Sequence, residues 1–269
     1  NQAGKSHKLG INQFADLTAE EFRSSRNGYK ASWNKKPTSG TTPFKYENVT
    51  GVPVAMDWRT QGAVTPIKDQ GECGCCWAFS AVAAVEGITK LSTGKLISLS
   101  EQELVDCDTR TNNGCGGGQM VEAFKFIINN EGITTEQNYP YTAAQGTCNT
   151  MITSDLAAKI TGYENVPANS EDSLLKAVAN QPVSVGIDAG CNDFYFYKEG
   201  VFQGDCGTNL NHAVTLIGYG TSDDGIEYWL IKNSWGTSWG EDGYMRMQRG
   251  VAAEGGLCGI AMQASYPTA

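Results

Sequence analysis

A cysteine at the start of a predicted helix is the residue whose position most strongly indicates chemistry. Cys76 ends a Gly-rich, cysteine-dense loop, and apolar residues then recur at the spacing of one helix face until about residue 92. Unpaired main-chain N–H groups and the positive end of the helix dipole favour an anion there, so the thiol is biased toward the nucleophilic thiolate. By residue type alone, disulfide or core roles for Cys73, Cys75 and Cys76 are more common. The partners of Cys76 must therefore decide its role.

The scarcity of histidine identifies the partner that such a thiol would use. The chain has two histidines, of which His7 lies near the amino end. His212 opens a strand-like run, 212–219, which a Gly- and Asp-rich turn joins to a second run, 227–233. Antiparallel pairing would place His212 beside Asn233, whose amide oxygen could fix the tautomer and leave one ring nitrogen for a nucleophile. A lone His at a strand edge is more often structural, but the presence of both a thiol and an Asn favours catalysis.

Length and cysteine content set the class of protein. The 269 residues are 40% hydrophobic and 18% charged, which suits a globular protein of one or two domains. No apolar run approaches the roughly 20 residues that a membrane span needs. Nine cysteines indicate an oxidising compartment, and the odd number leaves at least one thiol unpaired. The chain begins with Asn and no apolar signal segment follows, so we expect a processed or trimmed form.

The charge is unevenly distributed. Residues 1–51, here called the leader, hold eight Lys/Arg and four Asp/Glu, whereas residues 52–269, the body, hold twelve and twenty-five. An acidic body argues against nucleic acid as a partner. A basic leader could pack on it electrostatically, although a merely solvated surface explains the pattern equally well.

The leader reads as a short helix followed by a linker. Thr18 and Glu21 are spaced as a capping box, which predicts a helix start. From residue 23 to residue 51 the periodicity disappears and the composition is that of a linker. Asn48 begins the one Asn-x-Thr sequon of the chain, a candidate N-glycosylation site and weak support for secretion.

The body changes character near residue 163, which predicts two domains. Residues 52–163 are mainly helical, with further helices predicted over 101–107, opened by Ser100, and over 120–129. Residues 164–269 contain strand-like runs, including 182–188. The predicted fold class is α+β, a helical domain and a domain built on an antiparallel β-sheet.

Three motifs in this order resemble the papain family of cysteine proteases. They are Gln70-x-x-Cys73-x-Cys75-Cys76-Trp-Ala-Phe-Ser, Asn211-His212-Ala213 and Asn233-Ser234-Trp235-Gly236, with His and Asn close to the roughly 130–150 residues downstream that the family pattern gives. The resemblance covers the whole body and is nearest to plant vacuolar enzymes of the senescence-associated type. The leader resembles the end of the family's inhibitory pro-region, with the element Gly10, Asn12, Phe14 and Asp16, but the family's upstream pro-helix is missing.

The resemblance implies a role for each motif residue. It implies a papain-like fold with the active-site cleft between the two domains. Cys76 would attack the scissile carbonyl, His212 would protonate the leaving amine and Asn233 would orient His212. The Gln70 amide and the Cys76 N–H would stabilise the oxyanion, and Trp235 would shield the His–Asn bond.

The resemblance also implies how substrate binds. Gly117 and Gly118 would pair with an extended substrate backbone, and Asn211 would contact it. The pocket for the residue two before the cut would be lined by Met120, Gly186, Leu210, Ala213 and Gln263. This lining predicts a hydrophobic or aromatic preference, with Gln263 leaving room for longer polar groups.

The same resemblance implies disulfides, partners and location. The disulfides would be Cys73–Cys115, Cys107–Cys148 and Cys206–Cys258. The partners would be protein and peptide substrates, the enzyme's own pro-region and cystatin-like protein inhibitors, with no cofactor, metal, nucleic acid or membrane, and the protein would be a monomer. We expect a zymogen of the secretory pathway, vacuolar, lysosomal or extracellular, activated when acid promotes removal of the leader between Asn48 and Val54.

Two cysteines depart from the family pattern. Cys75 stands where Ser, Gly or Ala is usual, and Cys191 has no family partner. We expect them to stay unpaired, Cys191 on the far side of the cleft and Cys75 as a buried thiol with a pKa near or above about 8.5. Alternatives are an inactive papain-like storage or binding protein, and a dithiol oxidoreductase using Cys73 and Cys76. Zinc is disfavoured because a second paired Cys/His cluster is missing.

Overall fold

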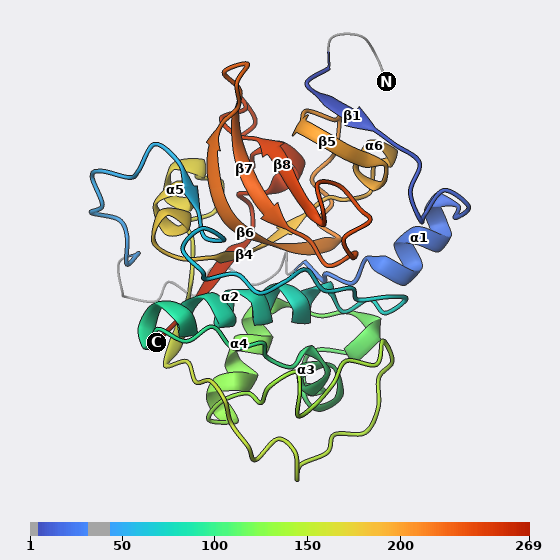
Figure 1. Ribbon diagram of the computed structural model, residues 1–269, viewed down its shortest axis with the longest axis vertical. Coiled ribbons are helices and arrows are strands. Elements are labelled where there is room, and N and C mark those ends of the chain that lie inside the picture. Colours follow the sequence, from blue (N-terminus) through green and yellow to red (C-terminus); the bar gives the residue numbers. More distant parts are fainter. Residues whose placement is uncertain (1–4, 32–43) are drawn as a thin grey trace.

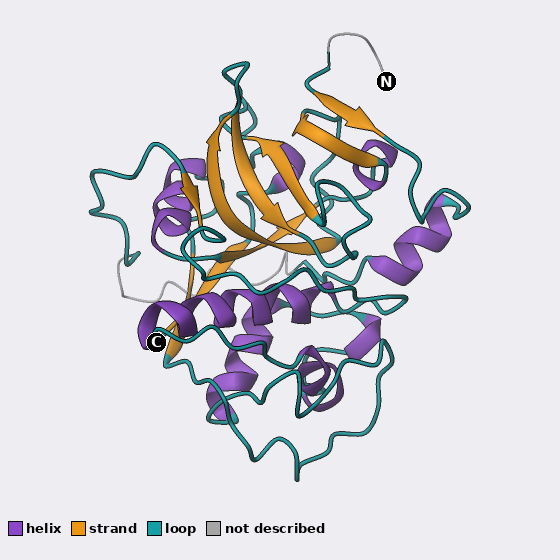
Figure 2. Cartoon of the chain, viewed as in Figure 1, coloured by secondary structure: helices purple, strands orange, loops and turns teal. Residues whose placement is uncertain are grey.

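The computed structural model describes residues 5–31 and 44–269. The sheet and the main helices form separate layers, with the helices below the sheet in the view of Figure 1 and coloured purple in Figure 2. The helical layer consists of α2 (Cys76–Thr93), α3 (Glu101–Cys107) and α4 (Met120–Asn129). Two further helices, α5 (Glu171–Asn180) and α6 (Asn192–Tyr195), accompany the sheet. This is the α+β architecture that the sequence predicts.

The sheet is largely antiparallel. Its strand order is β1-β5-β8-β7-β6-β4-β9-β3, and β2 pairs with β6 outside this path. Among the pairs that join these strands, only β5 with β8 is parallel. The strands are β1 (His7–Leu9), β2 (Met56–Asp57), β3 (Gly162–Asn165), β4 (Val183–Ile187), β5 (Tyr197–Phe202), β6 (His212–Thr221), β7 (Glu227–Lys232), β8 (Tyr244–Gln248) and β9 (Ala264–Thr268).

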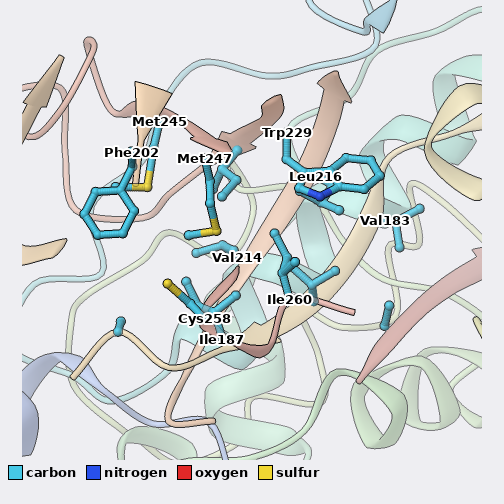
Figure 3. Packing of buried hydrophobic residues seen from close by; sticks show 14 of the residues in the cluster. Val183, Ile187, Phe202, Val214, Leu216, Trp229, Met245, Met247, Cys258 and Ile260 are labelled. Carbon is cyan, nitrogen blue, oxygen red and sulfur yellow. The ribbon is translucent and has the colours of Figure 1, made fainter. Parts of the chain in front are cut away.

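The largest apolar core belongs to the sheet layer. Figure 3 shows part of it, with Val214 and Leu216 of β6 near Trp229 of β7 and the two methionines of β8. All but the last residue of β6 are buried, so this central strand is covered on both faces. Its β-branched and aromatic composition suits such a position.

Helix α2 joins the two layers. Its residues 76–82 are all buried, and it packs against β6. The Ser80 hydroxyl donates to the Val214 carbonyl at 2.7 Å, and the Ser184 hydroxyl donates to the Ser80 carbonyl at 2.9 Å. Gly94 ends the helix in the left-handed conformation. These bonds fix the amino end of α2, and therefore Cys76, at the boundary between helices and sheet.

The hairpin of β6 and β7 is confirmed. Thr215 pairs with Lys232, and a bulge at Ile217 shifts the register before Gly218 pairs with Leu230. The predicted helices over 101–107 and 120–129 are also confirmed, the first capped by the Ser100 hydroxyl.

One local expectation was wrong, and two short strands were not predicted. The helix α1 (Ala19–Arg26) has the predicted Thr18–Glu21 capping box but extends beyond residue 23. Phe22 is its one buried residue, so the sequence shows no apolar periodicity there, and the hydroxyls of Ser24 and Ser25 bond to a carbonyl of the same helix. Strand β1 of the leader adds to the sheet edge beside β5, and β2, within the range assigned to the helical half, also belongs to the sheet. Strands this short carry no readable periodicity.

A buried charge cluster holds the loop that leads to the site. The Lys68 ammonium lies 3.2 Å from the Glu86 carboxylate and 2.7 Å from that of Glu101. The Lys232 ammonium donates to the Thr65 carbonyl at 2.9 Å. Buried charges persist only when they are paired in this way, so the cluster fixes the segment 65–70 against α2, α3 and β7.

Candidate active site

His212 and Asn233 meet where the hairpin begins and ends. His212 Nε2 lies 2.8 Å from Asn233 Oδ1, and the same oxygen accepts the Ser234 N–H at 2.8 Å. Because Oδ1 can only accept, Nε2 carries the proton and Nδ1 is free to act as a base. Nδ1 is buried and has no hydrogen-bond partner within the described part of the chain. Trp235 stacks on the imidazole at a centroid distance of 4.5 Å, which excludes water from the His–Asn bond.

Cys76 is the first residue of α2, and its thiol is fully buried. Burial raises the pKa of the thiol to about 11, although the main-chain N–H groups of Ala213, Gly28 and Trp77 act in the opposite direction. Burial likewise lowers the pKa of His212 to about 4, against the effect of Asn233. In this form, with the leader over the site, burial therefore opposes the thiolate that the helix amino end favours.

The side-chain amide of Gln70 binds the leader. Its Nε2 donates to the Arg26 carbonyl at 2.9 Å and to the Cys73 carbonyl at 2.8 Å. The Ser234 hydroxyl donates to Gln70 Oε1 at 2.6 Å, which fixes the orientation of the amide. The Arg26 carbonyl thus binds the same amide that, by the sequence analysis, would donate to the oxyanion of the reaction.

The leader continues along the site as an extended strand. Gly118 N–H donates to the Gly28 carbonyl at 2.8 Å, and Lys30 N–H donates to the Gly118 carbonyl at 3.0 Å. Tyr29 N–H donates to the Asn211 carbonyl at 3.0 Å. Gly117 makes no such pair but approaches closely, since a methyl group there would lie 2.5 Å from the Gly28 carbonyl oxygen.

The side chain of Tyr29 enters the pocket predicted from the sequence. It is 9% exposed and belongs to one apolar cluster with Met120, Leu210 and Ala213. A methyl group at Gly186 would lie 2.4 Å from its ring, so only glycine leaves room for it. The Tyr29 hydroxyl donates to Gln263 Oε1 at 2.5 Å. Gly186 and Gln263 of the predicted pocket therefore meet this leader side chain, and the other three residues share its apolar cluster.

Aromatic contacts hold the leader more strongly than its charges do. Phe14 and Phe22 are buried and meet the Trp235 ring edge to face, at 5.8 Å and 5.0 Å. Burying one such ring contributes about 1.5–3 kcal/mol, whereas exposed ion pairs contribute little. Within the described part of the leader, the ion pairs to the body are Lys5–Asp193, Lys8–Glu199 and Arg26–Asp69. The charge contrast between leader and body is thus a secondary cause of docking.

Not every residue of the element Gly10, Asn12, Phe14 and Asp16 contacts the body. Gly10 N–H donates to the Phe196 carbonyl, and the Asn12 amide donates to the Tyr195 carbonyl. The Asp16 side chain is exposed. The first three residues therefore bind the body and the fourth faces solvent.

The cysteines divide into six paired and three free. The disulfides join Cys73 to Cys115, Cys107 to Cys148 and Cys206 to Cys258, the pairs that the family resemblance implies. Cys75, Cys76 and Cys191 are free. Burial raises the pKa of Cys75, as predicted, and its thiol lies 2.9 Å from the Tyr141 hydroxyl, which donates to the Gln70 carbonyl.

Cys191 lies beside the leader. It lines a cavity of about 490 Å³ with Gly28, Tyr29, Asp188 and Asn211, so it borders the groove that the leader covers. It remains apart from Cys75, as expected. In residues 5–31 and 44–269 there is no group of three or more His, Cys, Asp or Glu side chains that could hold a metal ion. No helix in those ranges is long and apolar enough to cross a bilayer.

Sequence reasoning missed three residues of the site. Arg26 and Tyr29 lie in a stretch read as linker, and Tyr141 lies in a loop. Their role depends on contacts with distant segments. The one available signal was the isolated aromatic of Gly28-Tyr29-Lys30, in a polar stretch that has no core of its own to fill.

A thiol at a helix amino end, an imidazole held by an Asn and a covering leader define a cysteine protease in its proform. Residues 52–268 match the sequence profile of the family described as papain family cysteine protease, and the chain belongs to this family. It is a papain-like cysteine endopeptidase, a hydrolase made as a proform.

Plant relatives and solved structures agree with this assignment. The chain is 59% identical to the senescence-specific cysteine protease SAG12 of Arabidopsis thaliana, over 99% of this chain and 78% of the relative. It is 48% identical to the Amb a 11 cysteine protease of ragweed pollen in its proform, with a TM-score of 0.92, over 98% of this chain and 82% of that one. Bromelain of Ananas comosus in complex with the E64 inhibitor is 52% identical, with a TM-score of 0.78, over 81% and 99% of the two chains.

Proposed function

We propose that Cys76, His212 and Asn233 hydrolyse peptide bonds, with Gln70 as oxyanion donor. The observation that carries this proposal is the position of the leader. Its Arg26 carbonyl binds the Gln70 amide, and the next residues run past the Cys76 thiol. A substrate carbonyl that replaced Arg26 would meet a thiol, a base and a fixed donor together.

The proposed reaction uses the free nitrogen of His212. Once the leader leaves, solvent reaches the site and the thiol proton passes to His212 Nδ1. The Cys76 sulfur attacks the scissile carbonyl carbon, and the oxyanion accepts hydrogen bonds from Gln70 Nε2 and the Cys76 N–H. As the C–N bond breaks, the imidazolium returns its proton to the leaving amine. Water, deprotonated by His212, then hydrolyses the thioester and restores the thiol.

Substrate would lie where the leader lies now. An extended chain would bond to the two main-chain groups of Gly118 and to the Asn211 carbonyl, as the leader does. The side chain two residues before the cut would enter the Tyr29 pocket. Because that lining is mostly apolar, the proposed preference is for hydrophobic or aromatic residues.

Activation requires loss of the leader, proposed to occur between Asn48 and Val54 under acid conditions. Asn48 lies in an exposed turn and Val54 is 89% exposed, so a protease can reach this segment. The exposed Asn48 side chain is also compatible with the proposed N-glycosylation.

Partners and location follow from the family and the surface. The proposed partners are protein and peptide substrates, the leader itself and cystatin-like protein inhibitors that would enter the same cleft, and the proposed state is a monomer. Three disulfides and the plant relatives support a secretory route to a vacuole or to the outside of the cell. The acidic body disfavours nucleic acid as a partner.

One leader residue gives a direct test. A methyl group at Gly28 would lie 1.7 Å from the Gly74 carbonyl oxygen, so Gly28→Ala must displace the leader, whereas Gly51 has open space around it. We expect the uncut Gly28→Ala chain to hydrolyse a fluorogenic peptide and to be labelled by an epoxysuccinyl inhibitor, and the uncut Gly51→Ala chain to stay blocked. Equal activity of the two uncut chains would refute the proposed block.

A further inference from the structure

The two proposed oxyanion donors stand at opposite ends of one loop. Gln70 begins this loop, and the Cys76 N–H ends it at the start of α2. Gly71 and Gly74 lie between them, and glycine restricts the main chain less than other residues do. Because two donors can bind one oxygen only at a fixed spacing, contacts that brace this loop matter for the reaction.

The hydroxyl of Tyr141 bridges the two ends of the loop. It donates to the Gln70 carbonyl at 2.7 Å and lies 2.9 Å from the thiol of Cys75, the residue before Cys76. A phenol has a single proton to donate, and here the carbonyl, which can only accept, receives it. The Cys75 thiol is therefore the donor to the phenol oxygen. Gln70 and Cys75 are fully buried, so both groups are kept from bulk water.

Tyr141 is held against α2, whereas Gln70 is also bound to the sheet layer. The Tyr141 ring meets Phe79 of α2 edge to face, at a centroid distance of 4.9 Å. The Gln70 N–H donates to the Ser234 carbonyl at 2.9 Å. Ser234 thus ties Gln70 to the sheet layer, and Tyr141 ties it to the helix that carries the nucleophile.

We infer that Tyr141 is a positioning residue that sets the spacing of the two oxyanion donors, with the Cys75 thiol as its supporting hydrogen-bond donor. This inference rests on the proposed function, since it concerns the same oxyanion site. Because Tyr141 acts through Gln70, its hydroxyl should affect kcat and leave KM nearly unchanged. The loss of one such hydrogen bond corresponds to about fivefold in rate.

The test removes only the hydroxyl and asks whether its effect needs Gln70. In the leader-free enzyme, Tyr141→Phe should lower kcat about fivefold with little change in KM. In enzyme that already carries Gln70→Ala, the same change should have no further effect, because the amide that Tyr141 positions is gone. An equal loss in the two backgrounds, or no loss in the first, would overturn the inference.

Tyr139→Phe is the matched control. The Tyr139 hydroxyl also bonds to a buried group, the Asp106 carboxylate at 2.8 Å, but it does not bond to the loop 70–76. We expect this variant to have a lower Tm and an unchanged kcat. Alkylation of Cys76 by iodoacetamide forms no oxyanion, so its rate should be equal in Tyr141→Phe and the unaltered enzyme. Slower alkylation in Tyr141→Phe would mean that the nucleophile itself is disturbed, and would contradict the inference.

Cys75 gives a second test, which does not depend on the folding of Tyr141→Phe. Cys75→Ser keeps a donor and should keep kcat, whereas Cys75→Ala removes the donor and should lower kcat about twofold to threefold. Equal loss in the two variants would contradict the role of the thiol as a donor. If no peptide is cleaved and Cys76 is not labelled, the proposed function fails and this inference fails with it. Cleavage that is unaffected by Tyr141→Phe removes the inference alone.

Discussion

The side-chain amide of Gln70 donates a hydrogen bond to the main-chain carbonyl of Arg26 at 2.9 Å. The leader thus binds the site by the same group that is proposed to stabilise the oxyanion. Docking of the leader and the proposed oxyanion binding therefore use one donor, so one substitution should affect both.

Replacing Gln70 by Ala should lower kcat of the mature enzyme by about 10²–10³-fold, the usual cost of an oxyanion donor, with little change in KM. The same change should weaken docking of the leader, because the Arg26 carbonyl loses its partner. Steady-state kinetics on leader-free enzyme measure the first effect, and inhibitor labelling of the uncut chain measures the second. A lowered kcat with unaltered labelling would separate the two roles and contradict the shared donor.

Substitutions of the three proposed catalytic residues should lower activity by different factors. We expect Cys76→Ala and His212→Ala each to abolish peptide hydrolysis, with losses of about 10⁵-fold or more, while Asn233→Ala weakens it by a smaller factor. The reason is that the proposed role of Asn233 is only to orient His212, through the 2.8 Å bond. Circular dichroism should show that all three variants fold. Equal loss in the three would contradict the orienting role.

Acid release of the leader should begin with His7. This histidine is buried, its Nδ1 accepts the Gln203 N–H at 3.2 Å, and Lys5 and Asp193 are the charged groups that face it. Burial and then Lys5 lower its pKa below 6.5, against the effect of Asp193, so the docked leader binds the neutral form. Docking should be complete above about pH 6.5 and should weaken as pH falls through the pKa of docked His7.

Carboxylates of the body should contribute to release of the leader only at a lower pH than His7 does. The Lys8 hydrogen bond and charge lower the pKa of Glu199 below 4.5, so this pair contributes above that pH and is lost only in stronger acid. In a Cys76→Ala chain, which cannot cut itself, hydrogen exchange of β1 should rise between pH 7 and pH 5, and His7→Phe should flatten that rise. Lys8→Ala is the control and should alter only the range below about pH 4.5. If hydrogen exchange of β1 rises equally in His7→Phe, His7 is not the acid sensor and the carboxylates are.

The three unpaired cysteines should be detectable as free thiols that differ in reactivity. Denaturation without reductant should reveal three free thiols, Cys75, Cys76 and Cys191. In the native leader-free enzyme at pH 5, a thiol reagent should modify Cys76 first, since burial raises the pKa of Cys75 and holds it as a thiol. A total of one free thiol would mean that two of them are paired.

The sequence predicts the parts of the site that local patterns encode. The periodicity after Cys76 and the hairpin from His212 to Asn233 are properties of contiguous segments, so their positions could be read directly. The pocket residues came from motif resemblance. The contacts of Tyr29 could not be predicted, because a linker-like stretch gains its conformation only from the body on which it lies.

The protonation state of Cys76 was beyond local reasoning for a related reason. A helix amino end favours the thiolate, but burial acts against it in this form and raises the pKa to about 11. The short strands β1 and β2 likewise exist only through their partners β5 and β6.

Labelling of Cys76 by an epoxysuccinyl inhibitor, followed by peptide mapping, tests the central claim most directly. The uncut chain at pH 7 should remain unlabelled, and after leader removal the label should map to Cys76 alone, leaving Cys75 and Cys191 free. Rapid labelling of Cys76 in the uncut chain, or a label on another cysteine after removal, would contradict the claim that Cys76 is the nucleophile and that the leader covers it.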